Sequence, residues 1–261
     1  YLLPQTYGSY KFPFRKWSVD LIRKAALAYA RDEKTAKEVG DFVKVTSDMA
    51  FGLPYDKAAY SFDAKKKFGI NVSSLLWDDN TRGRFGLSID YKAFYRSLIT
   101  YLIETGEYQV HIIPHVIDNK NYEAAENDYR VCCELEKEFK GHVILAPAFE
   151  TAIQAKSYIS NMDVFLGSRM HSTIGAISSG VATIPLSYAY KFEALYSHIN
   201  YPYVINARKA TTEEALKMTK QWASERDKLK ETGEIAVSHA LDELVDFKND
   251  LKISLKNNDI L

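Results

Sequence analysis

Arg169 and His171 are the residues whose types and spacing most clearly permit chemistry. They stand in FLGSRMHSTIGAISSG, residues 165–180, where an apolar strand runs directly into a helix of small residues. In extended backbone, residues i and i+2 point the same way, so we expect both side chains on one face. Arginine supplies a planar fork for carboxylate or phosphate, and histidine supplies a proton donor near neutral pH. The pair therefore suits phosphoryl or enol chemistry.

The helix that follows this pair adds to the predicted site. Ser172 and Thr173 can begin a helix whose N–H groups attract an anion, which makes Ser172 a candidate for binding substrate. Residues 175–180 are mostly Gly, Ala and Ser, which pack closely but bury little apolar area, so the segment indicates geometry more than stability. The residues alone leave a second interpretation open, in which Arg169 pairs with a buried aspartate and His171 is a hydrogen-bonded structural histidine.

Two neighbouring strands are predicted to end beside the same site. The strand over 182–188 continues into Tyr188 and Lys191, and the side chain of Lys191 is long enough to reach an anion held by Arg169. Viewed alone, Lys191 fits a solvated lysine at a helix start better, and its place beside a second basic residue favours the binding role. His115 follows the strand YQVHIIP, whereas His111 lies within it and is expected to be a packed histidine. We therefore add Tyr188, Lys191 and His115 to the substrate-binding candidates.

Other sequence motifs point less clearly to a function. The sequence has no zinc spacing, no P-loop and no G-x-G-x-x-G, so we expect neither a metal nor a cofactor. Arg82 and Arg84 either face a ligand or are solvated loop residues. Asp32 and Asp48 follow strands of the first part, where a carboxylate can accept a proton from a sugar hydroxyl, cap a helix or pair with Arg31.

The amino-acid composition limits the kinds of function that the protein can have. The 34 basic residues balance the 34 acidic residues, so no global field favours nucleic acid, and an anionic ligand needs a local basic cluster. The only two cysteines, Cys132 and Cys133, are adjacent, which favours a reducing compartment. No apolar run is long enough for a membrane span and no signal-like segment occurs, so we expect a soluble cytoplasmic protein, with peripheral membrane contact left open.

The pattern of elements predicts an α/β protein. Strands and helices alternate over 1–60, a connector with Gly52, Pro54 and three lysines covers 50–69, and the alternation restarts with a strand at 70–77. Five successive βα steps over 61–206 predict a parallel, doubly wound sheet.

The charged residues that follow are predicted to form two helices, over 211–233 and 235–254, that cross back to the first domain. Thr211 and Glu214 are placed as a capping box at the start of the first of them. We thus expect domains at 1–60 and 61–206, followed by helices at 207–261.

Several separated blocks resemble the polysaccharide pyruvyl transferase family. They are LLPQTYG, AYARDEKT, VTSDMAFGL, INVSSLLW, HIIPHV and DVFLGSRMHSTIGAISSGVATIPLSYAYKFEAL, in that order over about residues 1 to 200. The family's glycine-rich N-terminal opening has no counterpart here, and Tyr1 begins abruptly in an interior-like strand. We therefore expect that part of the natural protein precedes Tyr1 and that the first domain is only its latter half.

The resemblance implies both fold and chemistry. It implies two Rossmann-like domains in a GT-B-like arrangement, the N-terminal one incomplete. It also implies transfer of the enolpyruvyl unit of phosphoenolpyruvate to a sugar of a surface polysaccharide or its lipid-linked precursor, forming a pyruvate ketal and releasing phosphate. The family's Arg-x-His block falls on Arg169, which would hold phosphoenolpyruvate, and His171, the general acid. The base is not identified; Asp48 and His115 are candidates.

Two rival functions share this fold. A GT-B glycosyltransferase would use a nucleotide sugar and needs an acidic residue in the second domain for the ribose, for which Glu193 is the obvious choice. A non-catalytic protein would keep the cleft and bind glycans. The Arg169–His171 pair with Lys191 fits a small, highly charged donor better than a uridine.

Overall fold

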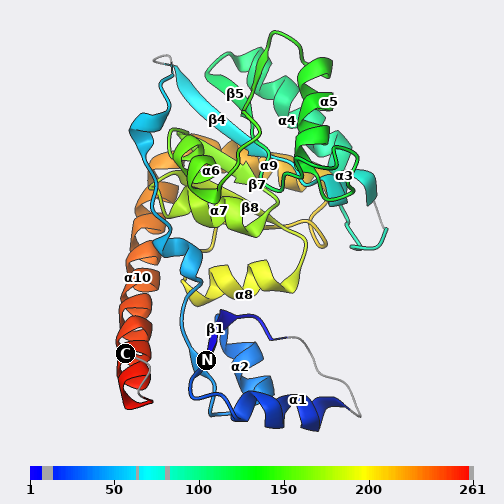
Figure 1. Cartoon of the computed structure of the whole chain (residues 1–261). Coiled ribbons are helices and arrows are strands. Elements are labelled where there is room, and N and C mark those ends of the chain that lie inside the picture. Colours follow the sequence, from blue (N-terminus) through cyan, green and yellow to red (C-terminus); the bar gives the residue numbers. More distant parts are fainter. Residues whose placement is uncertain (8–13, 63–64, 80–82, 259–261) are drawn as a thin grey trace. The chain divides into compact units, whose positions relative to one another are not determined.

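The structure, a computed structural model, describes residues 1–7, 14–62, 65–79 and 83–258 (Figure 1). The chain divides into two compact units. Unit 1 comprises Tyr1–Gly52, Glu193–Pro202 and Ile235–Leu261, and unit 2 comprises Leu53–Phe192 and Tyr203–Glu234. The first boundary thus falls at Gly52 and not at residue 60, and two later segments of the chain join unit 1.

Unit 1 is built on a three-stranded parallel sheet in the order β1-β2-β3. The Asp32 carboxylate accepts a hydrogen bond of 2.9 Å from the Thr35 N–H and so caps α2. Ile22, Ala30 and Val39 belong to its apolar core. The elements of the first part of the chain are β1 (Leu2–Gln5), α1 (Phe14–Arg23), β2 (Ala28–Ala30), α2 (Glu33–Val39), β3 (Lys44–Val45), and the 3-10 turns η1 (Met49–Gly52) and η2 (Lys57–Ala59).

Unit 2 contains a six-stranded sheet in the order β6-β5-β4-β7-β8-β9, with every pair parallel. Counted from β4, this order is 3-2-1-4-5-6, the doubly wound Rossmann order. The strands are β4 (Lys66–Asn71), β5 (Tyr108–Ile112), β6 (Val143–Leu145), β7 (Val164–Gly167), β8 (Ala182–Ser187) and β9 (Ile205–Asn206). The helices are α3 (Ser74–Asp79), α4 (Tyr91–Thr105), α5 (Asp128–Glu138), α6 (Ala152–Ile159), α7 (Met170–Ile177), α8 (Tyr190–His198), α9 (Thr212–Ser224) and α10 (Arg226–Asn257).

The strand predicted at 70–77 was placed too late. β4 spans Lys66–Asn71, and Ser74–Asp79 form helix α3. The lysine run, which suggested a connector, belongs partly to β4: Lys66 is exposed at the start of the strand, and residues 68–71 are buried. The last four residues of β4 are buried on both faces, as expected for a central strand of a parallel sheet.

The C-terminal helices also differ from the prediction. The break between them falls at Glu225, and Gly233 lies inside the single helix α10. The capping box of Thr211 and Glu214 is confirmed. Helix α9 does not return to unit 1; its buried face, Ala215, Thr219 and Ala223, belongs to unit 2. Only the part of α10 from Ile235 onward joins unit 1.

None of the helices in the described part of the chain is both long enough and apolar enough to cross a membrane.

Candidate active site

The candidate site lies where the carboxyl ends of β4, β5, β7 and β8 converge in unit 2. The strand order reverses between β4 and β7, and ligands of open parallel sheets bind beyond the strand ends at such a point. Asn71 ends β4, and Arg169 follows β7. The sequence-predicted residues of unit 2 therefore come from the loops that the fold gathers at the switch point.

A buried carboxylate that the sequence prediction missed organises these loops. Asp128, the first residue of α5, is 0% exposed. One of its oxygens accepts the Ser74 N–H at 2.9 Å, and the other accepts the Val116 N–H at 3.0 Å. Asp128 thus ties the loops after β4 and β5 together, in addition to its bonds with Arg169. Sequence patterns alone did not single out Asp128.

Arg169 is held by that carboxylate. Its Nη2 donates to Asp128 at 2.7 Å and its Nε at 3.1 and 3.2 Å, and Nη2 also donates to the Glu126 carbonyl at 3.1 Å. Burial alone would lower the pKa of Arg169, but Asp128 raises it on balance. The interpretation of Arg169 as paired with a buried aspartate is therefore the one that the structure supports. The charge of the guanidinium is largely balanced by the protein itself.

Asn71 fixes the start of α7. Its side-chain oxygen accepts the Arg169 N–H at 3.0 Å and the Ser172 hydroxyl at 3.1 Å, and its NH₂ donates to the Ile113 carbonyl at 3.0 Å. The Ser172 hydroxyl also donates to the Arg169 carbonyl at 2.7 Å, and Ser172 is 0% exposed. In this structure the Ser172 side chain therefore fixes the turn into α7. The backbone N–H of Ser172 donates to the Arg169 carbonyl at 3.1 Å. The N–H groups that precede it in α7, those of residues 170 and 171, therefore lie at the open N-terminal end of the helix.

Two histidines lie near this helix start. His171 is exposed in the first turn of α7. His115 has a buried Nδ1 with no hydrogen-bond partner among the described residues. Burial lowers the pKa of His115 to about 4; Asp128 opposes this shift, and the charges of His171 and Arg169 add to it. His115 is therefore neutral at neutral pH, and it lies close enough to His171 for a charge on His171 to lower the pKa of His115.

Tyr188 and Lys191 follow β8. Tyr188 is partly buried, with its ring centroid 5.4 Å from that of Phe85 and 5.6 Å from that of Phe192. Burial raises the pKa of Tyr188, and the charge and hydrogen bond of Arg169 partly offset the rise. Tyr188 therefore reaches the Arg169 cluster, as its predicted position requires. Lys191 lies exposed in the first turn of α8.

A buried hydroxyl network, also missed by the sequence prediction, supports the strand ends from behind. The Tyr91 hydroxyl donates to Ser168 Oγ at 2.8 Å and accepts the Ser73 N–H at 2.9 Å. The Tyr95 hydroxyl donates to the Asn71 carbonyl at 3.0 Å. Burial raises the pKa of both tyrosines, so they are neutral donors at neutral pH. Sequence patterns alone gave no sign of these bonds.

The other candidates lie outside this cluster. Asp48 binds Arg31 at 2.6 Å in unit 1, and Asp32 caps α2, so both carboxylates have the structural partners that the sequence allowed. His111 is fully buried and its Nδ1 lies 2.8 Å from the Tyr158 hydroxyl, which confirms it as a packed histidine. Arg82 lies outside the described residues.

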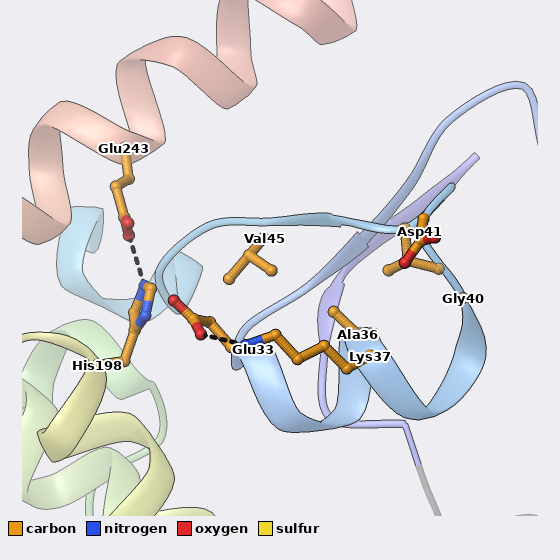
Figure 2. A pocket seen from close by; sticks show the side chains of 9 residues that line it. Glu33, Ala36, Lys37, Gly40, Asp41, Val45, His198 and Glu243 are labelled. Carbon is orange, nitrogen blue, oxygen red and sulfur yellow. Dashed lines mark hydrogen bonds and ion pairs between the residues drawn. The ribbon is translucent and has the colours of Figure 1, made fainter.

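Unit 1 contains a separate pocket of about 420 Å³ (Figure 2). None of the predicted site residues lines it. Its lining is Glu33, Ala36, Lys37, Gly40, Asp41, Val43, Val45, His198 and Glu243. His198 Nε2 lies 2.9 Å from a Glu243 oxygen, and Lys37 pairs with Glu33 at 2.9 Å. The charged side chains of this pocket are thus largely paired with one another. In the described part of the chain, no three His, Cys, Asp or Glu side chains are grouped so that they could hold a metal ion.

The pair of His198 and Glu243 predicts a pH-dependent stability. The hydrogen bond and charge of Glu243 raise the pKa of His198, so this contribution is full below about pH 6.5 and is lost as pH rises through the folded-state pKa. For Glu243, burial alone would raise the pKa, but His198 and Ser47 lower it, so its contribution is lost only in acid. We expect His198→Gln to lower the free energy of unfolding by about 1 kcal/mol near pH 6 and by less near pH 8. Urea unfolding at both pH values measures this, and an equal loss at both would contradict it.

Two glycines around Arg169 predict opposite effects. A Cβ on Gly167 would meet Phe165 Cε1 at 2.7 Å and Ser172 Oγ at 2.9 Å, so Gly167→Ala is expected to cost about 1–3 kcal/mol. A Cβ on Gly175 would meet Lys156 Cγ at 3.7 Å and Lys156 Cβ at 3.9 Å, which are ordinary contacts, so Gly175→Ala should stabilise α7 by about 0.5–1 kcal/mol. Thermal and urea unfolding of the two variants test this. Destabilisation by Gly175→Ala would show that close packing requires the small-residue helix at that position too.

Comparison with known proteins identifies the family. Residues 1–190 match the family model for polysaccharide pyruvyl transferases. The chain belongs to this family. This match confirms the family, named for transferases, that the separated sequence blocks resemble. No curated protein sequence matches the chain.

Solved structures support the fold of this family member. It is similar to α,α-trehalose 6-phosphate synthase from Burkholderia multivorans, with a TM-score of 0.59 and 10% identity over 95% of this chain and 62% of that one. It is also similar to UDP-GlcNAc 2-epimerase from Neisseria meningitidis, with a TM-score of 0.55 and 13% identity over 95% of this chain and 67% of that one. The chain therefore spans about two thirds of the length of these proteins. At such identities the likeness concerns the fold alone, and it confirms the predicted Rossmann-like, GT-B-like class.

Proposed function

We propose that this protein transfers the enolpyruvyl unit of phosphoenolpyruvate to a sugar of a surface polysaccharide or its lipid-linked precursor, forming a pyruvate ketal and releasing phosphate. The observation that carries the proposal is the family match over residues 1–190, which include every proposed site residue except Lys191. The reaction would take place in the cytoplasm, in keeping with the free thiols of Cys132 and Cys133.

The donor is a small anion that needs several positive groups. Nε and Nη2 of Arg169 donate to the Asp128 carboxylate and the Glu126 carbonyl, and Arg169 also hydrogen-bonds Tyr188, so much of the guanidinium is occupied by the protein itself. The outermost N–H groups of α7 and the exposed Lys191 would supply the remaining attraction for phosphate and carboxylate. We therefore propose that Arg169 orients the donor, while Lys191 and the N-terminus of α7 add positive charge beside it.

The chemistry requires one proton at carbon. In the proposed reaction His171 protonates the methylene carbon, which leaves C2 electron-poor and oxocarbenium-like. A sugar hydroxyl then adds at C2 and loses its proton to a base, and phosphate leaves with its bonding electrons. A second hydroxyl adds at C2 and also loses its proton, which closes the ketal. His171 is exposed and so accessible to substrate, and it lies beside the Arg169 cluster.

The base for the hydroxyl steps is proposed to be His115. Its pKa of about 4 keeps it unprotonated at neutral pH, and its Nδ1 has no partner among the described residues. Asp48 is a weaker candidate, because its carboxylate already binds Arg31 at 2.6 Å in unit 1. A base with so low a pKa acts best once the hydroxyl has begun to bond to the electron-poor C2.

A nucleotide-sugar glycosyltransferase is the second candidate. The similar structures include a trehalose 6-phosphate synthase and an epimerase bound to UDP-GlcNAc. Glu193, in the first turn of α8, is the acid that the sequence offers for a ribose, but it belongs to unit 1 and not to the unit that holds Arg169. The Arg-x-His block with Lys191 is better suited to a compact anion than to a nucleoside. A glycan-binding protein without catalysis is the third possibility.

Phosphate release distinguishes these functions. The protein is incubated with phosphoenolpyruvate and a panel of galactose-, mannose- and glucosamine-containing acceptors, and free phosphate is measured against a reaction without acceptor. Acceptor-dependent release supports pyruvyl transfer. Consumption of a nucleotide sugar without such release would favour the glycosyltransferase, and tight acceptor binding with neither reaction would favour the glycan-binding protein.

A further inference from the structure

Helix α1 of unit 1 has two apolar faces, although packing in the fold uses only one. Ile22 is buried, and Val19 and Ala25 pack beside it against the core of unit 1. Phe14 and Trp17 are nevertheless 68% and 67% exposed. A surface helix needs a single apolar stripe. The second stripe therefore has some use other than folding of the described chain.

The exposed stripe is continuous. Phe14, Trp17 and Leu21 are spaced i, i+3 and i+7, which places them on one side of the helix, and Leu21 is 54% exposed. An aromatic pair with a leucine is the composition by which interfacial helices enter the boundary between lipid headgroups and acyl chains. The ten residues of α1 rise about 15 Å, half the thickness of a hydrocarbon core, so such a helix would lie in the membrane plane.

The charge around the stripe favours an anionic lipid surface over a protein core. Residues 14–24 hold four basic side chains and one acid, whereas the whole chain is balanced at 34 and 34. Arg15 donates to the Glu38 carbonyl at 3.1 Å, and Arg23 lies 5.0 Å from the Phe42 ring centroid. Lys16 and Lys24 are exposed at the two ends of the stripe, where their long stems can lie along apolar surface and place the ammonium groups at lipid phosphates.

We propose that α1 docks unit 1 onto an anionic membrane surface, with Phe14, Trp17 and Leu21 inserted and Lys16 and Lys24 at the headgroups. This docking does not depend on the proposed reaction, because it needs neither donor nor acceptor. If the acceptor is lipid-linked, docking would raise its concentration near the protein.

Vesicle sedimentation tests the docking. The whole chain is mixed with vesicles of phosphatidylcholine alone or with phosphatidylglycerol added. We expect binding only to the anionic vesicles, weakened by salt, and reduced roughly tenfold or more in Phe14→Ser/Trp17→Ser. Ile235→Ser is the matched control, because Ile235 is 69% exposed on another helix of unit 1. Lys16→Glu/Lys24→Glu should also weaken binding but retain the folded circular dichroism spectrum.

The fluorescence of Trp17 gives a second readout. Of the three tryptophans, Trp17 is exposed, Trp77 is 3% exposed and Trp222 is partly buried. Anionic vesicles should therefore shift the emission to shorter wavelength in the wild type and not in Trp17→Phe. Failure to bind anionic vesicles would overturn the proposal, as would equal loss in Ile235→Ser. A change of oligomeric state in Phe14→Ser/Trp17→Ser without vesicle binding would also overturn it, and would assign the stripe to a protein contact.

Discussion

Replacing His171 with alanine is expected to lower acceptor-dependent phosphate release roughly 10²–10⁴-fold, because the proposed reaction loses its proton donor. His171 is exposed at the start of α7, so its removal should leave the fold intact. The measurement is the initial rate of phosphate release from phosphoenolpyruvate at saturating acceptor, with urea unfolding of the same sample as a check on stability.

A matched histidine controls for surface effects. His142 is exposed just before β6, outside the candidate site, and His142→Ala should keep the wild-type rate. Imidazole added to His171→Ala should restore part of the rate, since its protonated form, imidazolium, can supply the missing proton. A His171→Ala variant with a rate near that of the wild type would contradict the assignment of His171 as the general acid.

Asp128 is expected to be the largest single contributor to stability in unit 2. Asp128→Ala leaves the Arg169 guanidinium buried without its carboxylate and frees the N–H groups of Ser74 and Val116. Breaking a buried pair from one side costs about 3–5 kcal/mol. The measurement is the free energy of unfolding in urea, and we expect the phosphate-release activity to be lost as well.

A double substitution separates the pair from the rest of the site. Arg169→Met alone leaves the Asp128 carboxylate unpaired, whereas Asp128→Ala with Arg169→Met removes both charges. We therefore expect the double variant to lose less stability than the sum of the two single losses. Asp118→Ala, at an exposed turn, should cost under about 1 kcal/mol. Strict additivity, or a small effect of Asp128→Ala, would contradict the central role of this ion pair.

The fold followed from the sequence because it depends on local patterns. Alternating strands and helices predicted the parallel sheet, and the capping box at Thr211 marked the start of α9. The errors occurred where tertiary context overrides such patterns. The lysines before Phe68 resembled a connector, but they lie at the solvent-facing start of β4. Gly233 resembled a helix end, but the long helix α10 tolerates it as an interior residue.

The position of the site could be predicted from the sequence, but its hydrogen bonds and ion pairs could not. Strand ends in a parallel sheet converge whatever the sequence, so Arg169, His115 and Tyr188 could be grouped without coordinates. The partner of Arg169 could not be identified, because Asp128 lies 41 residues away and is one of many acids at helix starts. The same holds for Asn71, whose amide connects three segments that only the folded chain brings together.

The mass of the acceptor product tests the central claim most directly. A sugar acceptor incubated with the protein and phosphoenolpyruvate should gain the mass of one pyruvate less one water, as a ketal requires, with one phosphate released for each ketal formed. No gain should occur with His171→Ala. An acceptor that gains a hexose from a nucleotide sugar, or that remains unchanged while phosphate accumulates, would contradict pyruvyl transfer.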